Sequence, residues 1–482
     1  MQDGIIYNIR KKIGNSLLII FVSILFLIIF SLWLLGNPPY VIAERVPGLD
    51  NRPKTISETD NVIIGEFFES YNLKEEILPG SWPRFRGSDY DNICKDTTPL
   101  SENWPADGPP VLWQHELGEG YAAPAIYKGK VFILDYDEQN KADALRCFSL
   151  KTGEELWKRW YHVALKRNHG MSRTIPAVNE NYIVTIGPRC HVMCLNQNNG
   201  ELLWSLDLEK DMGTETPNWY TGQCPLIDNN TAIIAVGGRS ILAGIDCATG
   251  NIIWETPNPD NWKMSHSSVL PATIHGKKMY LYNAIGGICG ISAEGDDTGE
   301  LLWKTSGWSP PVVVPSPVYA GNNEIIVTAG YGAGGSKIKI NKNNSGYEAT
   351  VIEKHTPREG LASEQHTPVL SGEFIWTILP KDAGTLRNQL VCYHISDINI
   401  PVWASGKENR YGLGPYMICR DKMFLLNDDG ELFFFRFNSN SISILANHKV
   451  LNGTDAWSPM AMADGYLLLR DANFLLCLYV GE

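Results

Sequence analysis

The chain has 482 residues, of which 44% are hydrophobic and 20% are charged, and its formal net charge is −12 at pH 7. These proportions are typical of a globular protein with a sizeable core. The negative charge excludes a nucleic-acid-binding protein that relies on a basic face, because phosphate recognition needs clustered lysine and arginine.

The first predicted element is a membrane-spanning helix. Residues 16–35 form a run of 20 without a charged residue, and a helix of that length is roughly 30 Å long, the thickness of a hydrocarbon core. Arg10, Lys11 and Lys12 precede it, which predicts that residues 1–15 are cytoplasmic. We expect an uncleaved signal anchor over residues 16–36 in the inner (cytoplasmic) membrane, with the remaining chain in the periplasm. A cleaved signal peptide is the alternative.

Residues 37–80 are predicted to be a linker. The segment opens with Asn37-Pro38-Pro39 and continues as a polar stretch. Residues 61–78 carry several apolar side chains, which favours a short helix that packs on another surface. The periodic part of the chain begins near Ser81 and runs to the end.

Two sets of regularly spaced residues, here called the proline comb and the tryptophan comb, divide the periodic part into similar units. The first comb consists of prolines spaced 44 to 52 residues apart, at Pro124, Pro176, Pro225, Pro271, Pro317, Pro368, Pro415 and Pro459. Each proline opens a short strand, a polar turn and a second strand rich in β-forming residues. The second comb consists of tryptophans that end a strand–turn–strand pattern, at Trp113, Trp157, Trp204, Trp254, Trp303 and Trp403.

This repeat predicts an all-β protein, an eight-bladed β-propeller with four antiparallel strands in each blade over residues 81–482. The unit that begins at Pro459 contains only three strands. The strand around Trp113 supplies the fourth, so that the two ends of the sequence share one blade and close the ring. Units five and seven lack a tryptophan in the comb, and their fourth strands are inferred.

Four of the ten cysteines, Cys147, Cys194, Cys392 and Cys477, occupy one equivalent strand position. Equivalent positions in different blades are far apart, so these four are not expected to pair with one another. We interpret them as small, buried, apolar side chains.

The blade ending with Thr-Gly followed by tryptophan resembles the docking motif of pyrroloquinoline quinone (PQQ) dehydrogenases and PQQ-like propellers. The segment from Trp82 to Gly87, WPRFRG, is similar to the opening of bacterial PQQ-like propeller proteins. The resemblance covers residues 81–482. It implies either a dehydrogenase with PQQ and calcium on the channel axis or a non-catalytic member such as the propeller lipoprotein of the outer-membrane β-barrel assembly machinery. The chain has no adjacent cysteine pair and no CxxCH haem motif, two features found in part of the dehydrogenase branch.

Candidate binding residues precede the prolines, because the innermost strand of each blade begins there and its preceding loop lines one mouth of the channel. The polar, charged and aromatic candidates are Arg173, His266, Glu364, Gln365, Arg410, Asp455 and Trp457. Arginine forks can bind carboxylates, and two of the candidates are carboxylates that could bind calcium. The alternative is a solvated ring of polar side chains at the channel mouth that binds no ligand.

We therefore expect a membrane-tethered periplasmic propeller that acts as a scaffold for other envelope proteins. The alternative is a membrane-anchored quinoprotein that oxidises an alcohol or sugar with PQQ and calcium. A sensor that binds a small polar ligand in the channel is a third hypothesis.

The loop at residues 330–335, GYGAGG, follows a predicted strand, but no helix pattern follows it. We therefore do not expect it to bind a phosphate, and we expect a flexible loop.

Overall fold

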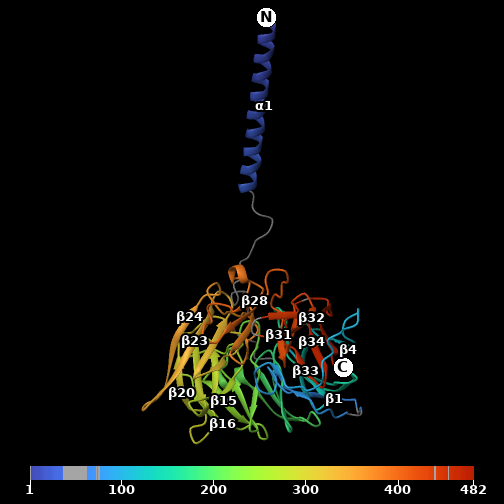
Figure 1. Cartoon of the computed structure of the whole chain (residues 1–482), viewed down its shortest axis with the longest axis vertical. Helices are drawn as coiled ribbons and strands as arrows, with labels where there is room; N and C mark the ends of the chain where they lie inside the picture. Colours follow the sequence, from blue (N-terminus) through green and yellow to red (C-terminus); the bar gives the residue numbers. More distant parts are fainter. Residues whose placement is uncertain (1, 36–61, 72, 74–75, 439–440, 454) are drawn as a thin grey trace. The chain divides into compact units, whose positions relative to one another are not determined.

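The computed structural model describes residues 2–35, 62–71, 73, 76–438, 441–453 and 455–482. The chain forms two compact units, residues 1–58 and residues 59–482. Position 36 of the predicted anchor and residues 37–61 of the predicted linker lie outside the described residues. Figure 1 shows the chain coloured along the sequence.

The first unit contains one helix, α1 (Gln2–Leu35). The described side chains of its apolar part are exposed, with Trp33 at 72% and Leu35 at 83%. Within the part of the chain that the structure describes, no helix meets the length and apolarity needed to span a membrane.

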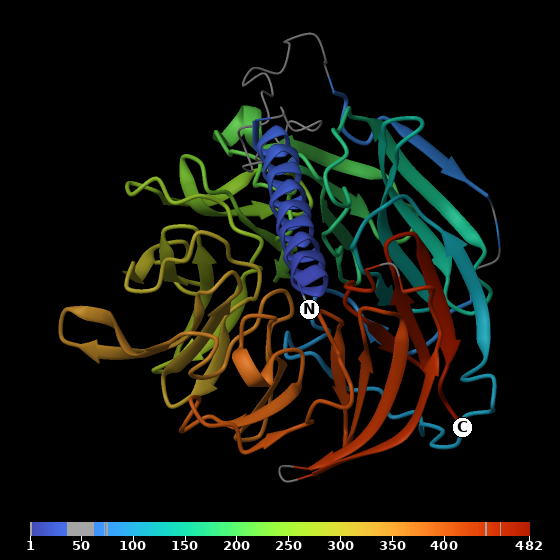
Figure 2. The same cartoon turned by 90° about the horizontal axis from the view of Figure 1, so that it is seen from above.

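The second unit is the predicted eight-bladed propeller, and Figure 2 shows its sheets around a common axis. Blade one contains β5 (Ala125–Tyr127), β6 (Lys130–Asp137), β7 (Ala142–Ser149) and β8 (Glu155–His162), with β1 (Phe67–Ser70) and β2 (Ser81–Trp82) at its edges. Blade two contains β9 (Ala177–Val178), β10 (Tyr182–Ile186), β11 (His191–Asn196) and β12 (Leu202–Asp207), followed by α2 (Leu208–Met212). Blade three contains β13 (Leu226–Asp228), β14 (Thr231–Ala235), β15 (Ser240–Asp246) and β16 (Ile252–Pro257).

The remaining blades follow the same order from the axis outward. Blade four contains β17 (Leu270–Ile274), β18 (Lys277–Ala284), β19 (Gly287–Ser292) and β20 (Leu301–Thr305). Blade five contains β21 (Val318–Gly321), β22 (Glu324–Ala329), β23 (Gly334–Asn343) and β24 (Gly346–His355). Blade six contains β25 (Val369–Ser371), β26 (Phe374–Ile378), the 3-10 turn η1 (Gly384–Leu386), β27 (Leu390–His394) and β28 (Trp403–Ala404).

The last two blades also take strands from the amino-terminal part of the unit. Blade seven contains β29 (Tyr416–Cys419), β30 (Lys422–Leu426), β31 (Glu431–Asn438) and β32 (Ser441–Lys449), with β3 (Ile93–Cys94) beside β29. Blade eight contains β33 (Ala461–Ala463), β34 (Tyr466–Arg470), β35 (Phe474–Tyr479) and β4 (Val111–Glu116).

The ring closes in blade eight as the sequence predicts. Strand β4 pairs antiparallel with β35, and Trp113 lies opposite Cys477. The blade therefore joins strands from both ends of the unit, and the pairing removes two sheet edges that an open array would leave unsatisfied. Apolar clusters fill the spaces between neighbouring blades, as for Phe132 of blade one and Ile183 of blade two, which belong to the same cluster.

The tryptophan comb marks the outermost strand of six of the eight blades. Trp113 of blade eight packs on Gly153 of blade one, where an added Cβ would lie 2.5 Å from the indole. The indole Nε1 of Trp113 also donates to the Leu150 carbonyl at 2.8 Å. Gly153 itself has a φ of 73°, which a residue with a side chain adopts only at a cost. Gly200, Gly250 and Gly299 meet Trp157, Trp204 and Trp254 in the same way, so these four tryptophans pack against the next blade.

The predicted interpretation of the four equivalent cysteines is also confirmed, because each is buried and lies opposite a tryptophan. The cross-strand pairs are Cys147–Trp157, Cys194–Trp204, Cys392–Trp403 and Cys477–Trp113. Glycine takes the cysteine position in blades three and four, at Gly244 and Gly290. A small residue is needed there because a Cβ on Gly244 would lie 2.2 Å from Trp254.

Blades five and seven reach the same packing without the tryptophan. In blade seven Phe434 on the third strand faces Ala446 on the fourth, so the large and small residues have exchanged strands. In blade five Lys337 faces Glu353, and their charged groups lie 3.5 Å apart. Both blades keep the register shift that follows the tryptophan pair elsewhere, and their fourth strands are β24 and β32.

The segment before the first complete blade differs from the prediction of a linker with a short helix. Residues 67–70 form β1, which pairs antiparallel with β8 on the outside of blade one. Phe67 stacks on Trp160 at a centroid distance of 5.5 Å. The free edge of β8 supplies the hydrogen-bond partner for this short strand.

Residues 80–100, here called the crossing segment, lie on the propeller axis. The segment pairs with the innermost strands of blades one and seven through β2–β5 and β3–β29. The Pro83 carbonyl accepts a hydrogen bond of 2.8 Å from Val178 of blade two. The Arg86 guanidinium donates to the carbonyls of Thr367 and Pro368 of blade six, at 2.9 and 3.2 Å. Because innermost strands line the axis, one segment that contacts four of them crosses it.

Candidate functional site

The loops that precede the innermost strands, together with the loop between β22 and β23 of blade five, bring a group of aromatic and charged side chains together at one end of the axis. We call this group the mouth cluster, and it consists of Tyr121, His169, Arg173, Trp219, His266, Tyr331, Asp455 and Trp457. The strand ends that pair with β2 and β3 are the carboxyl ends of β5 and β29. The crossing segment therefore enters the axis from the end opposite the mouth cluster.

Tyr121 organises one half of the mouth cluster. Its ring stacks on Trp457 with a centroid distance of 5.2 Å, and its hydroxyl donates to Asp455 Oδ2 at 3.3 Å. His169 packs edge-on against Trp457 at 5.3 Å. These contacts join loops of blades one, two and eight.

Arg173 lies against the same tyrosine. Its guanidinium carbon is 5.1 Å from the centroid of the Tyr121 ring, and Nη2 donates to the His169 carbonyl. Burial lowers the pKa of Arg173 to about 10, so the group remains a cation at neutral pH. Its Nε is buried and has no hydrogen-bond partner among the described residues. Arg173 therefore retains unused donor capacity.

Trp219 carries the other half of the mouth cluster. Its ring stacks on Tyr331 at a centroid distance of 6.2 Å with an interplanar angle of 11°. His266 lies 6.2 Å from Trp219. Burial, followed by the nearby positive charge of Arg173, lowers the pKa of His266 to about 4, so this imidazole is neutral at pH 7. Tyr331 is 58% exposed and presents its ring to solvent.

The backbone of these loops is held in an uncommon conformation. His169, Trp219, Tyr220, Tyr331 and Asp455 all have φ between 50° and 70°, although none is glycine. Such residues cost free energy that the surrounding structure must offset, and they concentrate at functional sites. The mouth cluster combines this strain with bulky aromatic side chains, which seldom occupy the left-handed region.

The structure distributes the other sequence-predicted residues over two places. Glu364 is buried against Gly330, in the loop that carries Tyr331, and burial raises its pKa. Gln365 follows it and is half-buried. Arg410 does not join Arg173, because its guanidinium forms an ion pair with Asp428, in which Nη2 and Oδ2 are 2.8 Å apart.

Four members of the mouth cluster were not among the residues predicted from the sequence: Tyr121, His169, Trp219 and Tyr331. His169 lies seven residues before Pro176, outside the range considered. Tyr121 stands three residues before Pro124, the same offset as Arg173 from Pro176, and this offset was a usable signal. Trp219 lies six residues before its proline, outside the range considered. Tyr331 belongs to the loop at residues 330–335 that was expected to be flexible, and here its ring stacks on Trp219.

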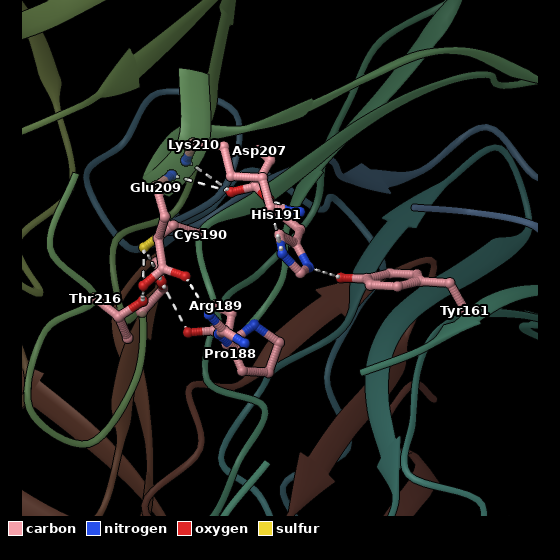
Figure 3. A network of polar contacts seen from close by, with 10 residues as sticks. Tyr161, Pro188, Arg189, Cys190, His191, Asp207, Glu209, Lys210 and Thr216 are labelled. Atoms are coloured by element: carbon pink, nitrogen blue, oxygen red, sulfur yellow. Dashed lines mark hydrogen bonds and ion pairs between the residues drawn. The ribbon is translucent and has the colours of Figure 1, made fainter. Parts of the chain in front are cut away.

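A second polar group, buried between blades one and two, is shown in Figure 3. The Tyr161 hydroxyl donates to Asp143 Oδ2 at 2.8 Å. It also lies 3.1 Å from His191 Nδ1, and Figure 3 marks this second contact. Burial raises the pKa of Asp143 to about 7 and lowers that of His191 to about 4. Burial also raises the pKa of the neighbouring Cys190 thiol to about 12, so no thiolate forms at neutral pH. Asp143, Tyr161, Cys190 and His191 are buried, so this part of the group links two blades and is not open to a substrate.

The donor set of the mouth cluster does not fit a calcium–quinone centre of the kind the resemblance implies. Among the described residues, no group of three or more His, Cys, Asp or Glu side chains is placed to share a metal ion. Asp455 accepts a hydrogen bond from Tyr121. The same tyrosine carries the Arg173 cation, whose charge disfavours a second cation beside it.

Comparison with solved structures agrees with the fold. A europium-containing methanol dehydrogenase is similar at 10% sequence identity and a TM-score of 0.56, over 82% of this chain and 91% of that one. The computationally designed Ika8 protein is similar at 11% identity and a TM-score of 0.50, over 77% and 100% of the two chains. BamB from Moraxella catarrhalis has 11% identity and a TM-score of 0.49, over 77% and 100%. At these identities, the methanol dehydrogenase and Ika8 show a shared fold only.

Comparison with curated proteins found no match. A family model described as outer membrane protein assembly factor BamB matches residues 140–400, which cover blades two to five completely. This match spans more than half of the chain and includes four of the six comb tryptophans. The chain therefore belongs to the family of outer membrane protein assembly factor BamB.

Proposed function

We propose that this protein is a membrane-tethered scaffold of the bacterial envelope that binds a protein partner through the mouth cluster. The observation that carries the proposal is the composition of the cluster, in which tryptophan, tyrosine and arginine side chains meet at one end of the propeller axis and Tyr331 is exposed. These three residue types dominate the energetics of protein interfaces. Membership in a family described as an assembly factor supports the same reading.

The tether is part of the proposal. The uncharged run at residues 16–35 and the exposed apolar side chains of α1 support an anchor in the inner membrane, with the propeller in the periplasm. A basic group before the run, at Arg10, Lys11 and Lys12, supports a cytoplasmic amino terminus.

A photo-crosslinking residue at position 331 of the full chain, expressed in its own host, tests the binding face. We expect a discrete adduct in the membrane fraction, because Tyr331 is exposed and stacks on Trp219. The same residue at position 347, on the outer hairpin of blade five, serves as the matched control. Arg173→Ala should reduce the adduct at least about fivefold, by removing the cation that packs on Tyr121.

Identical adducts from positions 331 and 347, or no adduct from position 331, would argue against the mouth cluster as a binding face. Release of the protein from membranes by an alkaline wash without detergent would contradict the anchor. The same preparation tests the quinoprotein alternative. Saturable PQQ binding together with dye-linked oxidation of an alcohol or sugar in the presence of calcium would show that the protein is a quinoprotein and would contradict the scaffold proposal.

A further inference from the structure

A pocket of about 630 Å³ lies beside blade six, separate from the members of the mouth cluster. Its lining includes four cationic side chains and several uncharged polar ones, but no carboxylate. The cations are Arg358, Arg387, Lys407 and Arg410. The charged residues of the lining are all cations, whereas the chain as a whole has a formal net charge of −12.

Three of these cations are not neutralised by the protein. Arg410 pairs with Asp428. Among the described residues, Arg358, Arg387 and Lys407 have no ion-pair partner. The carboxylate that follows Arg358, Glu359, instead accepts hydrogen bonds of 2.9 Å from the backbone and hydroxyl of Thr356.

The pocket is assembled from three loops that the backbone ties together. Arg358 follows β24 of blade five, Arg387 follows η1 of blade six, and Lys407 lies between β28 and β29. The Asn388 carbonyl accepts a hydrogen bond of 3.1 Å from the backbone N–H of Tyr411, which joins the second loop to the third. The side chain of Arg358 lies next to Gly384, with its Cγ 3.6 Å from the position of an added Cβ, which joins the first loop to the second.

We propose that this pocket binds a compact phosphate-bearing anion with at least two negative charges. Like-charged side chains brought together without a counter-charge repel one another, and an oxyanion would remove that repulsion. Arginine presents paired N–H donors that match two oxygens of a phosphate, and two arginines are free to do so here. Asn388 and Asn409 add uncharged polar groups to the lining. This site is independent of the protein-binding face proposed above.

Calorimetric titration of the full chain with inorganic pyrophosphate, in neutral detergent and low salt, tests the proposal. We expect saturable binding of one pyrophosphate per chain, weakened by added salt. Arg387→Ala and Arg358→Ala should each weaken binding at least about tenfold, which corresponds to about 1.4 kcal/mol. Arg387→Lys should lose part of the affinity, because it keeps the charge but not the fork.

Lys342→Ala is the matched control, because it removes one exposed cation from the outer hairpin of blade five and should leave binding unchanged. Absence of saturable binding to the unmodified chain would overturn the proposal. Equal affinity in the two arginine-to-alanine variants and the control would overturn it as well.

A competition experiment identifies the source of the anion. Mixed micelles that contain phosphatidic acid displace pyrophosphate if the pocket takes a lipid headgroup, whereas micelles with phosphatidylcholine do not. If neither displaces pyrophosphate, the ligand is a soluble phosphate compound. Displacement by both kinds of micelle would mean that the charge of the headgroup is irrelevant, which contradicts the proposed recognition.

Discussion

In seven of the eight blades, a large residue faces a small one at the position that the comb tryptophan occupies or would occupy. Trp113 is buried on β4 while its neighbour Leu112 is 43% exposed, because successive residues of a strand point to opposite faces. Its indole faces Cys477 within blade eight and covers Gly153 of blade one. One side chain thus contributes to a sheet, to the contact between two blades and to ring closure.

Trp113→Ala should lower the free energy of unfolding by about 3–5 kcal/mol, the usual cost of removing a buried aromatic side chain. The loss has two parts, the cavity beside Gly153 and the indole hydrogen bond to the Leu150 carbonyl, which would keep only the weak contact with Cys477 Sγ at 3.9 Å. Urea unfolding followed by circular dichroism measures it. Leu112→Ala, a truncation at the adjacent exposed position, should change the same quantity by less than about 1 kcal/mol; equal effects of the two substitutions would contradict the docking role.

At the scale of the element, a strand of one blade is coupled to a strand of the next through buried ionisable groups. Asp143 on β7 and His191 on β11 both contact the Tyr161 hydroxyl of β8. Their pKa values move in opposite directions for the same reason, since burial disfavours the charged form of each.

Asp143 should make the propeller less stable as the pH rises. Its pKa is about 7 in the folded protein against an ordinary 3.8, so the folded state binds more protons over that window. The free energy of unfolding therefore falls between about pH 4 and pH 7, by up to about 4 kcal/mol. His191 opposes this trend between about pH 4 and 6.5, because its folded-state pKa is the lower one.

Asp143→Asn isolates the aspartate contribution, because asparagine keeps an oxygen for Tyr161 but does not titrate. Urea unfolding at pH 4.5 to 8 should show that the variant gains stability relative to the unmodified chain as the pH rises. Asp107 is exposed, and Asp107→Asn is the control. Its free energy of unfolding should change with pH in parallel with that of the unmodified chain. Parallel curves for Asp143→Asn would refute the assignment.

At the scale of the whole molecule, the crossing segment joins blades that are distant around the ring. The WPRFRG motif, residues 82–87, forms part of this segment. Trp82 packs on Gly87, and the Arg84 guanidinium lies 5.1 Å from the Tyr90 ring. Arg86 donates to carbonyls of blade six and to those of Tyr90 and Asp91 within the segment. An arginine serves this purpose because its five donors lie in one plane and can reach four carbonyls at once.

Arg86→Ala should release the crossing segment without unfolding the blades. Hydrogen exchange of residues 81–95 should accelerate at least about tenfold, because the lost donors leave buried carbonyls unpaired. Arg86→Lys should not restore protection, since one ammonium group cannot replace the planar fork. Arg167→Ala removes an exposed arginine paired with Glu119 and should leave this exchange unchanged. Unaltered exchange in Arg86→Ala would mean that β2 and β3 alone hold the segment.

Much of the fold was accessible from sequence because its determinants are local and repeated. The proline comb marks where the innermost strands begin, as at Ala125 after Pro124, and the tryptophan comb marks where the outermost strands lie. Closure through β4 follows from counting three strands in the last unit. The fourth strand of blade seven could not be found from the tryptophan spacing. Its large residue, Phe434, lies on the third strand and faces the small Ala446 on the fourth.

The sequence by itself determined the propeller, its eight blades and its closure, because a repeated pattern of turns and alternating side chains depends on neighbours within one unit. Only the tertiary structure decided which side chains meet. Arg410 pairs with Asp428 rather than joining Arg173, and Tyr331 reaches Trp219 from a different blade. The crossing segment bridges blades hundreds of residues apart, as in the contact between Arg86 and Thr367. Such contacts depend on loop φ angles and on the angle between blades, neither of which a local pattern encodes.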